Sequence, residues 1–295
     1  MSANWGLRLA VLLPALWLVL FVAWPLLIVA EISFSEVVSA IPPYLPVFGW
    51  SESGPSVSGN VENYRLLASD ALYTASLLTS LRIAAVATAL TLLIGLPIAH
   101  GIARAEPRFR GALLLLVILP FWTSFLIRVY AWIGILKNEG LLNELLLALG
   151  LIDQPLTILT TEWAIHLGIV YAYLPFMVLP LYVAIERIDP ALREAAADLG
   201  ARGTATFFRI TLPLARPGIA AGCLLVFIPA MGEFVIPDLL GGPNTLMIGK
   251  TLWVEFFANR DWPVAAALAV VLLVLVLVGI AALDRAQRRA GEGLA

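Results

Sequence analysis

The stretch that decides the fold is Asp189–Pro213, which reads DPALREAAADLGARGTATFFRITLP and lies between two apolar runs that are each long enough for a membrane. Asp189 predicts an N-cap, Pro190 predicts the first helical residue, and Gly200 predicts a left-handed end. Residues 190–199 are therefore expected to form one short helix. About ten residues cannot cross a bilayer whose core needs roughly twenty.

The same stretch predicts a second short helix, which starts at Thr204 and ends before Pro213 because proline breaks helical hydrogen bonding. This helix carries Phe207, Phe208 and Ile210. The expected product is a pair of short helices that are joined by a glycine turn and lie outside the membrane.

The composition of the whole chain is that of an integral membrane protein. Of its 295 residues, 61% are apolar and 13% are charged, and the mean hydropathy is +0.95. Soluble proteins average about a quarter charged residues. Apolar runs of spanning length predict an all-α membrane protein with six transmembrane helices in a single domain, 1–295. The predicted spans are about 9–31, 76–103, 111–136, 161–186, 214–237 and 262–284, with a long outer loop at 35–70 and the charged loop at 189–213.

The first apolar run has a second interpretation as a cleaved signal peptide. Arg8 precedes it, and Val38–Ala40 resembles a cleavage site. The run is longer than the usual apolar core of about 7 to 15 residues, and Ala40 lies well beyond its end. A retained helix is therefore the preferred prediction.

Basic residues orient the chain, because lysine and arginine collect on the cytoplasmic side of a membrane. With a cytoplasmic N-terminus, most of the 18 basic residues fall in inner segments, and most acids, such as Glu36 and Glu144, fall outside. This places the C-terminus and the 189–213 loop in the cytoplasm, where ATP is available.

Seven residues in the 189–213 loop follow the pattern E-A-A-x3-G-x9-I-x-L-P: Glu194, Ala195, Ala196, Gly200, Ile210, Leu212 and Pro213. Here the chain resembles the permease subunits of ATP-binding-cassette importers, in which this loop sits in a groove of a separate ATPase subunit. The resemblance implies an ATPase-coupling site that also includes Asp198 and Phe207. The alternative is a surface helix hairpin with ordinary capping.

The resemblance implies a type I importer permease fold, with six transmembrane helices and a cytoplasmic coupling helix between the fourth and fifth. It also implies partners: two ATPase subunits inside, a second homologous permease, and a periplasmic solute-binding protein. The chain would be a multi-pass protein of a bacterial inner membrane, in contact with the lipid bilayer. ATP would be hydrolysed by another chain, so neither enzyme activity nor a cofactor is expected in this one.

Further blocks between about Asn63 and Ala282 resemble the spermidine/putrescine branch of these permeases, specifically the first of its two permease types. The blocks are Leu119–Trp132, Gly140–Asn143, Tyr173–Pro180, Ala195–Gly200, Pro217–Ile219, Gly232–Phe234 and Leu240–Gly242. This implies a polyamine substrate. Permeases for opines, iron and thiamine share parts of these blocks, so another small solute is the alternative.

The candidate pathway residues combine intramembrane acid with aromatic rings. Glu233 lies between apolar runs, where a carboxylate must face protein or water. It is either a site for a positively charged solute or a structural partner of Arg128 or Arg82. The aromatic residues either pack or line a route that stacks on a cation. The substrate-pathway candidates are Glu233, Trp122, Tyr173, Phe176 and Asp238.

Other classes of function lack their motifs. Gly249–Thr251 imitates the end of a phosphate-binding loop, but Asn244 stands where that loop requires glycine. Neither H-E-x-x-H nor G-x-S-x-G occurs, so no catalytic or metal-binding residues are predicted. Without basic arrays, a nucleic-acid partner has no support. The competing class is an ion-coupled secondary transporter that uses Glu233 as its coupling acid.

Overall fold

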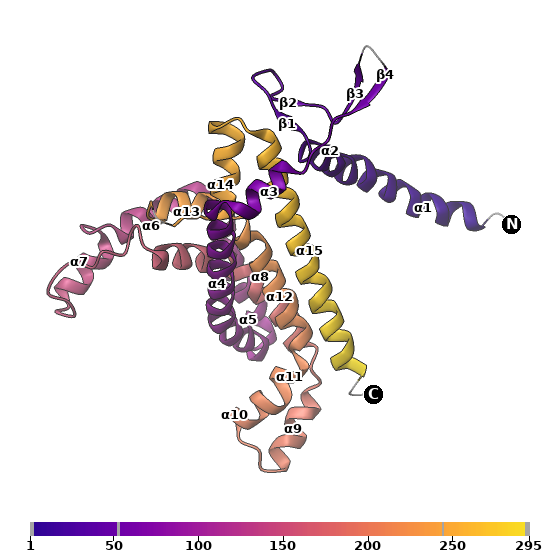
Figure 1. Cartoon of the computed structure of the whole chain (residues 1–295). Helices are drawn as coiled ribbons and strands as arrows, with labels where there is room; N and C mark the ends of the chain where they lie inside the picture. Colours follow the sequence, from indigo (N-terminus) through magenta and orange to yellow (C-terminus); the bar gives the residue numbers. More distant parts are fainter. Residues whose placement is uncertain (1–2, 52–53, 244, 293–295) are drawn as a thin grey trace. The chain divides into compact units, whose positions relative to one another are not determined.

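The computed structural model describes residues 3–51, 54–243 and 245–292, and it is helical over most of them (Figure 1). The α-helices are α1 (Ala3–Leu18), α2 (Trp24–Ile32), α3 (Glu62–Ser69), α4 (Ala71–Arg104), α5 (Pro107–Ile118), α6 (Phe125–Leu136), α7 (Leu141–Ala148), α8 (Glu162–Glu186), α9 (Pro190–Asp198), α10 (Gly203–Thr206), α11 (Leu212–Leu214), α12 (Arg216–Met231), α13 (Val235–Leu240), α14 (Ile248–Trp253) and α15 (Trp262–Glu292). Short π-helical segments at Val19–Ala23, Phe207–Thr211 and Val254–Ala258 and a 3-10 turn at Leu119–Trp122 extend these helices. The predicted all-α class is confirmed.

Two small antiparallel hairpins depart from the helical pattern. Strand β1 (Glu36–Val37) pairs with β2 (Tyr44–Leu45), and β3 (Phe48–Ser51) pairs with β4 (Gly54–Val57). The predicted outer loop at 35–70 is therefore not all loop, since it contains these hairpins and α3. Its prolines and glycines are compatible with this, because the same residues mark tight turns between short strands. Its place outside the membrane stays a prediction.

Within the described residues, four helices are long and apolar enough to cross a membrane: Ala10–Ile32, Ala71–Arg104, Glu162–Glu186 and Trp262–Ala281. Two more apolar segments are bent pairs, Pro107–Trp122 with Phe125–Ala148 at 89° and Gly203–Leu214 with Arg216–Met231 at 68°. If each bent pair counts as one crossing, the described residues contain six candidate spans, the number that the sequence predicts.

The predicted span at 111–136 is not one straight helix. The helix tightens into a 3-10 turn at Leu119–Trp122, and Thr123 is extended, with φ −91° and ψ 152°. Pro120 lies in this turn, where it removes a backbone donor and crowds the preceding carbonyl groups. The Thr123 hydroxyl donates to the Pro120 carbonyl oxygen at 2.8 Å, which satisfies a backbone acceptor at the break.

The predicted span at 214–237 is also interrupted. Helix α12 ends at Met231, and α13 begins only at Val235. Gly232 lies in the gap, where its low helix propensity favours a break. Irregular backbone at membrane depth needs polar partners inside the protein, and Glu233 provides them, as described below.

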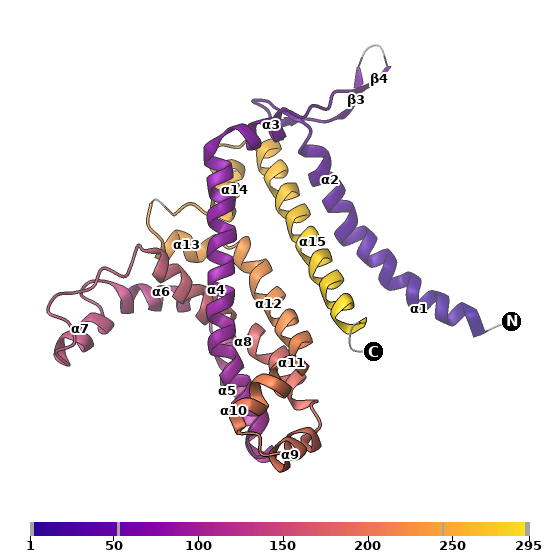
Figure 2. The same ribbon diagram turned by 60° about the horizontal axis from the view of Figure 1, so that its bottom comes forward.

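The chain divides into two compact units, which are described separately: residues 1–74 with 251–277, and residues 75–250 with 278–295. The prediction of a single transmembrane domain over 1–295 stays a prediction. In the second unit α8 packs along α12, and the two helices run side by side in Figures 1 and 2. The buried residues at their contact include Met177, Val178, Leu181 and Val226.

The close approach of α8 and α12 depends on two glycines spaced four apart on α12, as in membrane helix pairs with small residues at their contact. A Cβ on Gly218 would lie 2.4 Å from the Ala184 Cβ, and a Cβ on Gly222 would lie 2.7 Å from the Met177 sulfur. Only glycine fits at this crossing without displacing the partner helix.

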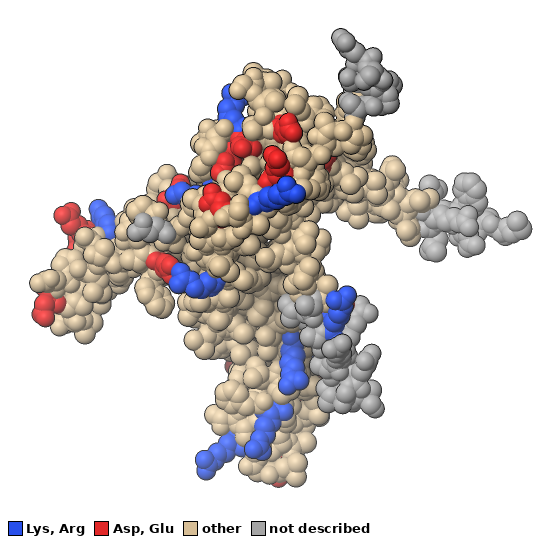
Figure 3. Space-filling model, viewed as in Figure 1, with Lys and Arg blue, Asp and Glu red and all other residues tan. Residues whose placement is uncertain are grey.

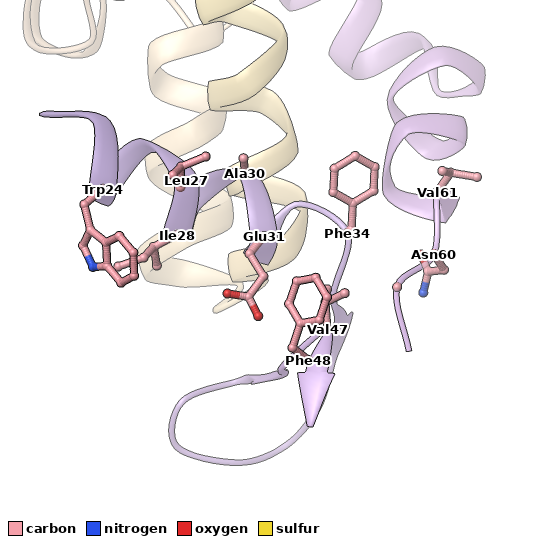
Figure 4. A pocket seen from close by; sticks show the side chains of 11 residues that line it. Trp24, Leu27, Ile28, Ala30, Glu31, Phe34, Val47, Phe48, Asn60 and Val61 are labelled. Carbon is pink, nitrogen blue, oxygen red and sulfur yellow. The ribbon is translucent and has the colours of Figure 1, made fainter. Parts of the chain in front are cut away.

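In the first unit, the buried carboxylate of Glu255 links the segment before α15 to Tyr73 at the start of α4. Glu255 accepts hydrogen bonds from the Tyr73 hydroxyl at 2.9 Å and from Asn259 Nδ2 at 2.8 Å. The same unit contains an apolar pocket of about 560 Å³ beside α2. Its lining includes the rings of Trp24, Phe34 and Phe48, and Figure 4 shows the Glu31 carboxylate beside the ring of Phe48.

Candidate functional site

Helix α9 forms as the capping residues predict. The Asp189 carboxylate accepts a hydrogen bond from the Ala191 amide at 2.9 Å, so it is the N-cap. At the other end the Gly200 amide donates to Ala197 O at 2.9 Å and the Ala201 amide donates to Ala196 O at 2.9 Å. This pair of bonds is a Schellman motif, and Gly200 supplies its left-handed residue with φ +79°.

The second arm of the segment is longer than predicted. It is helical without interruption from Gly203 to Leu214 and therefore passes through Pro213, where the sequence predicted an end. The π-helical turn at Phe207–Thr211 explains the difference: the Leu212 amide bonds to Phe207 O, which widens the helix just before the proline. Pro213 then lies in the first turn of α11, where a missing donor is tolerated.

Most of the coupling residues predicted on α9 are accessible. Glu194, Ala195, Asp198 and Gly200 are exposed, whereas Ala196 is buried. On the second arm the four predicted residues Phe207, Ile210, Leu212 and Pro213 are half-buried. Exposed Leu199 (89%) and Phe208 (63%) add apolar area to a surface that already carries two carboxylates.

The segment that contains α9, α10 and α11, which we call the α9–α11 segment, lies at one end of its unit, and α13 and α6 lie toward the other (Figures 1 and 2). In Figure 3 the charged side chains visible over this end are mostly blue, the colour of lysine and arginine. Exposed arginines in and beside the segment are Arg187, Arg202, Arg209 and Arg216. The segment is tied to α4 by Phe207, whose ring lies edge-to-face against His100 with centroids 5.0 Å apart.

Several hydrogen-bond donors surround Glu233, in the gap between α12 and α13. Its side chain is buried, at 8% exposure. One carboxylate oxygen accepts from the amides of Phe234 (3.2 Å), Val235 (3.1 Å) and Ile236 (3.4 Å). The other accepts from the Tyr173 hydroxyl at 2.5 Å. Glu233 thus satisfies the first amides of α13 and joins them to α8.

Neither arginine considered as a partner of Glu233 pairs with it, so that expectation is wrong. Arg82 forms an ion pair with Glu162 on α8. The guanidinium of Arg128 lies over the rings of Phe121 (5.0 Å) and Phe125 (5.7 Å). Backbone amides replace an arginine because Glu233 stands directly before a helix N-terminus, whose unpaired donors lie within reach.

The structure brings together three of the five predicted pathway residues. Tyr173 binds Glu233, and its ring lies 6.1 Å from Phe176. Phe176 in turn contacts Phe121, which the sequence analysis did not single out, at 5.2 Å. The other two candidates lie apart from this contact series, since Trp122 is 75% exposed and Asp238 forms an ion pair with Lys250 at 2.9 Å.

Residues 91–291 match the family described as "Binding-protein-dependent transport system inner membrane component". The chain belongs to this family.

Two relatives of the permease are named "Spermidine/putrescine transport system permease protein PotB". The protein from Haemophilus influenzae is 42% identical over 272 residues, which are 92% of this chain and 91% of that protein. The protein from Escherichia coli is 44% identical over 273 residues, 92% of this chain and 94% of that protein. The resemblance to the spermidine/putrescine branch is confirmed.

A solved structure of similar fold is that of a bacterial alginate ABC transporter in complex with an alginate pentasaccharide-bound periplasmic protein. It has a TM-score of 0.76 and 20% sequence identity, and the match covers 97% of this chain and 95% of that one. The permease therefore has the importer permease fold. It is a multi-pass inner membrane transport subunit and not an enzyme.

Sequence reasoning missed Gly249 of the permease, a residue that shapes the site. A Cβ at this position would lie 2.4 Å from Gly232 O and 2.8 Å from Glu233 O. The Ile248 amide beside it donates to the Ser80 hydroxyl oxygen at 2.7 Å. Gly249 therefore packs directly against the backbone of the gap that holds Glu233, and Ile248 links the same segment to α4, although nothing local in G-K-T signals either contact. Among the described residues, no group of three His, Cys, Asp or Glu side chains is placed to hold a metal.

Proposed function

We propose that the permease forms the membrane pathway of an ATP-driven importer for polyamines such as spermidine and putrescine. The observation that carries this proposal is the 44% identity, over 92% of the chain, with a protein named as a spermidine/putrescine permease. The alternative is another small solute, such as an opine, iron or thiamine.

The chemistry around Glu233 supports a cationic solute. A buried carboxylate is costly unless it is hydrogen-bonded, and Glu233 meets this cost with three amides and one hydroxyl. Tyr173 and Phe176 present rings beside it, and aromatic faces attract ammonium groups. We assign these three residues to the pathway. We propose that exposed Trp122 and ion-paired Asp238 lie at the margin of this pathway.

The α9–α11 segment is proposed as the handle through which ATPase subunits move the permease. Exposed Glu194, Ala195, Asp198 and Gly200 would be gripped by the ATPase, with Leu199 and Phe208 adding apolar contact area. The buried or half-buried residues of the segment would transmit the movement to the membrane helices. These are Ala196, Phe207, Ile210, Leu212 and Pro213. This support is geometric: a capped helix presents a rigid surface at one end of the unit.

The assembly would contain two ATPase subunits, a second homologous permease and a periplasmic solute-binding protein. The similar alginate transporter was solved with its periplasmic protein bound, which supports the last of these partners. The chain would cross the membrane six times as one domain, with both termini and the α9–α11 segment in the cytoplasm. This orientation rests on the arginines at that end.

Reconstitution of the complex tests this function. The permease with its partner permease and ATPases, in vesicles supplied with loaded binding protein, should accumulate radiolabelled spermidine or putrescine only with ATP. Uptake of thiamine or iron instead would reject the polyamine assignment. Uptake by the permease alone, driven by an ion gradient, would reject ATP coupling and favour a secondary transporter.

A further inference from the structure

A small cavity lies between the α9–α11 segment and the last turns of α4. Its volume is about 150 Å³, and its lining includes His100 and Arg104 from α4, Arg193 from α9, and Phe207 and Thr211 from the second arm. One water needs only about 10–15 Å³ of such space, so the cavity has room for a tetrahedral oxyanion.

The charges around the cavity have one sign. Both Arg104 and Arg193 line it, and no carboxylate does. Neither arginine belongs to an ion pair found among the described residues. Two guanidinium groups that share a cavity repel each other unless an anion lies between them. Helix α9 has two acidic residues, Glu194 and Asp198. Both are exposed, and neither lines the cavity.

His100 supplies a further polar group without a partner. Its Nδ1 atom is buried and, within the part of the chain that the structure describes, has no hydrogen-bond partner. Buried polar atoms are normally satisfied by protein, water or a bound ligand. The Phe207 ring packs edge-on against the imidazole and holds it at the cavity.

We propose that this cavity binds a phosphate group through Arg104, Arg193 and His100. Guanidinium groups bind phosphate oxygens with paired, charge-assisted hydrogen bonds, and they are preferred over lysine where planar recognition is needed. The bound group connects α4 to α9 and so holds the α9–α11 segment in place. Its source is either free phosphate or the phosphate of a lipid headgroup, since both offer the same oxygen atoms.

The test measures binding of inorganic phosphate to the purified full chain in phospholipid-free detergent, by calorimetry at constant ionic strength. A second arm adds short-chain phosphatidic acid to the same protein and counts bound molecules by native mass spectrometry. Arg104→Gln and Arg193→Gln should each weaken binding about tenfold or more, because charged hydrogen bonds are strong. Arg209→Gln is the matched control, since it removes an exposed arginine of the same segment that does not line the cavity.

Phosphate binding that follows this pattern identifies a free-phosphate site, and the same pattern with phosphatidic acid alone identifies a headgroup site. Absence of both, or equal weakening by Arg209→Gln, overturns the proposal. If a variant fails to fold, hydrogen exchange is measured on the unaltered chain, with and without the probe. Hydrogen exchange at residues 193–207 should slow by several-fold with the bound probe, and unchanged exchange also overturns the proposal.

Discussion

The Glu233 carboxylate makes four hydrogen bonds within the protein, three to backbone amides and one to the Tyr173 hydroxyl. The amides belong to the start of α13, so backbone donors hold this side chain where a basic side chain was expected. The same residue therefore both shapes the gap between α12 and α13 and presents a carboxylate beside Tyr173.

Replacement of Glu233 by glutamine separates these two roles. The glutamine oxygen still accepts from the α13 amides, so the complex should assemble, whereas the negative charge is lost. A charged hydrogen bond contributes about 1.5–3 kcal/mol, and 1.4 kcal/mol corresponds to a tenfold change. Spermidine uptake by proteoliposomes containing the whole complex should therefore fall about tenfold.

The control for this variant is Glu144→Gln, which removes an exposed acid from α7. Its uptake should match that of the unaltered complex. If Glu233→Gln transports as well as the control does, the carboxylate serves only as the cap of α13, and its place in the pathway is lost.

A second residue-scale prediction concerns Gly249. The Cβ of Gly249→Ala meets two backbone carbonyl oxygens at 2.4 and 2.8 Å, and backbone cannot give way as a flexible side chain can. Overpacking of this kind lowers the free energy of unfolding by about 1–3 kcal/mol. The midpoint of thermal unfolding in detergent should fall accordingly.

Gly101→Ala is the comparison for Gly249→Ala, because Gly101 lies within α4 and its Cβ would meet nothing within 4 Å. Alanine in a helix interior is more stable than glycine by about 0.5–1 kcal/mol, so this variant should keep or raise the midpoint. Equal midpoints for the two variants would show that the gap between α12 and α13 tolerates displacement.

At the scale of the elements, the breaks in the two interrupted spans are linked by packing. Helix α13 packs against both α6 and α8, and α6 begins just after the break at Thr123. The contact series Glu233, Tyr173, Phe176 and Phe121 crosses the same region. Non-helical backbone at membrane depth is tolerated where it lies within protein or lines a water-filled cavity. The proposed pathway therefore runs through the region where two spans are interrupted, one just before α6 and the other between α12 and α13.

The C-terminal cap of α9 gives an element-scale prediction. A valine in place of Gly200 must adopt φ near +79°, a conformation that costs an ordinary residue about 1–2 kcal/mol and suits a β-branched one least. Gly200→Val should shift the end of α9, reduce co-purification of the ATPase several-fold and lower ATP-dependent uptake with it. The permease itself should still be recovered in the membrane.

Gly203→Val is the matched control, three residues along the same segment. Its Cβ also meets nothing within 4 Å, and its φ is not positive. ATPase association should be close to normal in this variant. Normal association of Gly200→Val as well would mean that the shape of the α9 terminus does not matter for coupling.

At the scale of the whole molecule, the charge asymmetry supports our proposal that the α9–α11 end lies in the cytoplasm. Exposed arginines collect in and beside this segment, and positive residues are retained on the cytoplasmic side during insertion. Exposed acids such as Glu139 and Glu144 lie in and before α7, in the predicted outer part of the chain.

Thiol labelling tests this orientation. In a Cys223→Ser background, which removes the one cysteine of the chain, Arg202→Cys should react with an impermeant reagent in inverted vesicles but not in intact spheroplasts. Glu144→Cys should show the opposite behaviour. Labelling of Arg202→Cys in intact spheroplasts would place the segment outside and remove it from reach of any cytoplasmic ATPase.

The sequence by itself determined the features that depend on neighbours within a few residues. Asp189, Pro190 and Gly200 predict the limits of α9, because a cap and a left-handed residue act on the amides and carbonyls beside them. Apolar runs likewise predict the membrane crossings, since hydrophobic length is a local property. The pattern from Glu194 to Pro213 was sufficient to indicate the family.

Only the tertiary structure decided how these elements meet. The partner of Glu233 is Tyr173, 60 residues earlier, and the pattern of residues around each gives no sign of the other. The continuation of the helix through Pro213 likewise depends on a π-helical turn. The need for glycine at position 249 depends on two carbonyl groups in the gap between α12 and α13. Such contacts depend on helix packing, in which side chains distant in sequence compete for the same space, and no local preference encodes that competition.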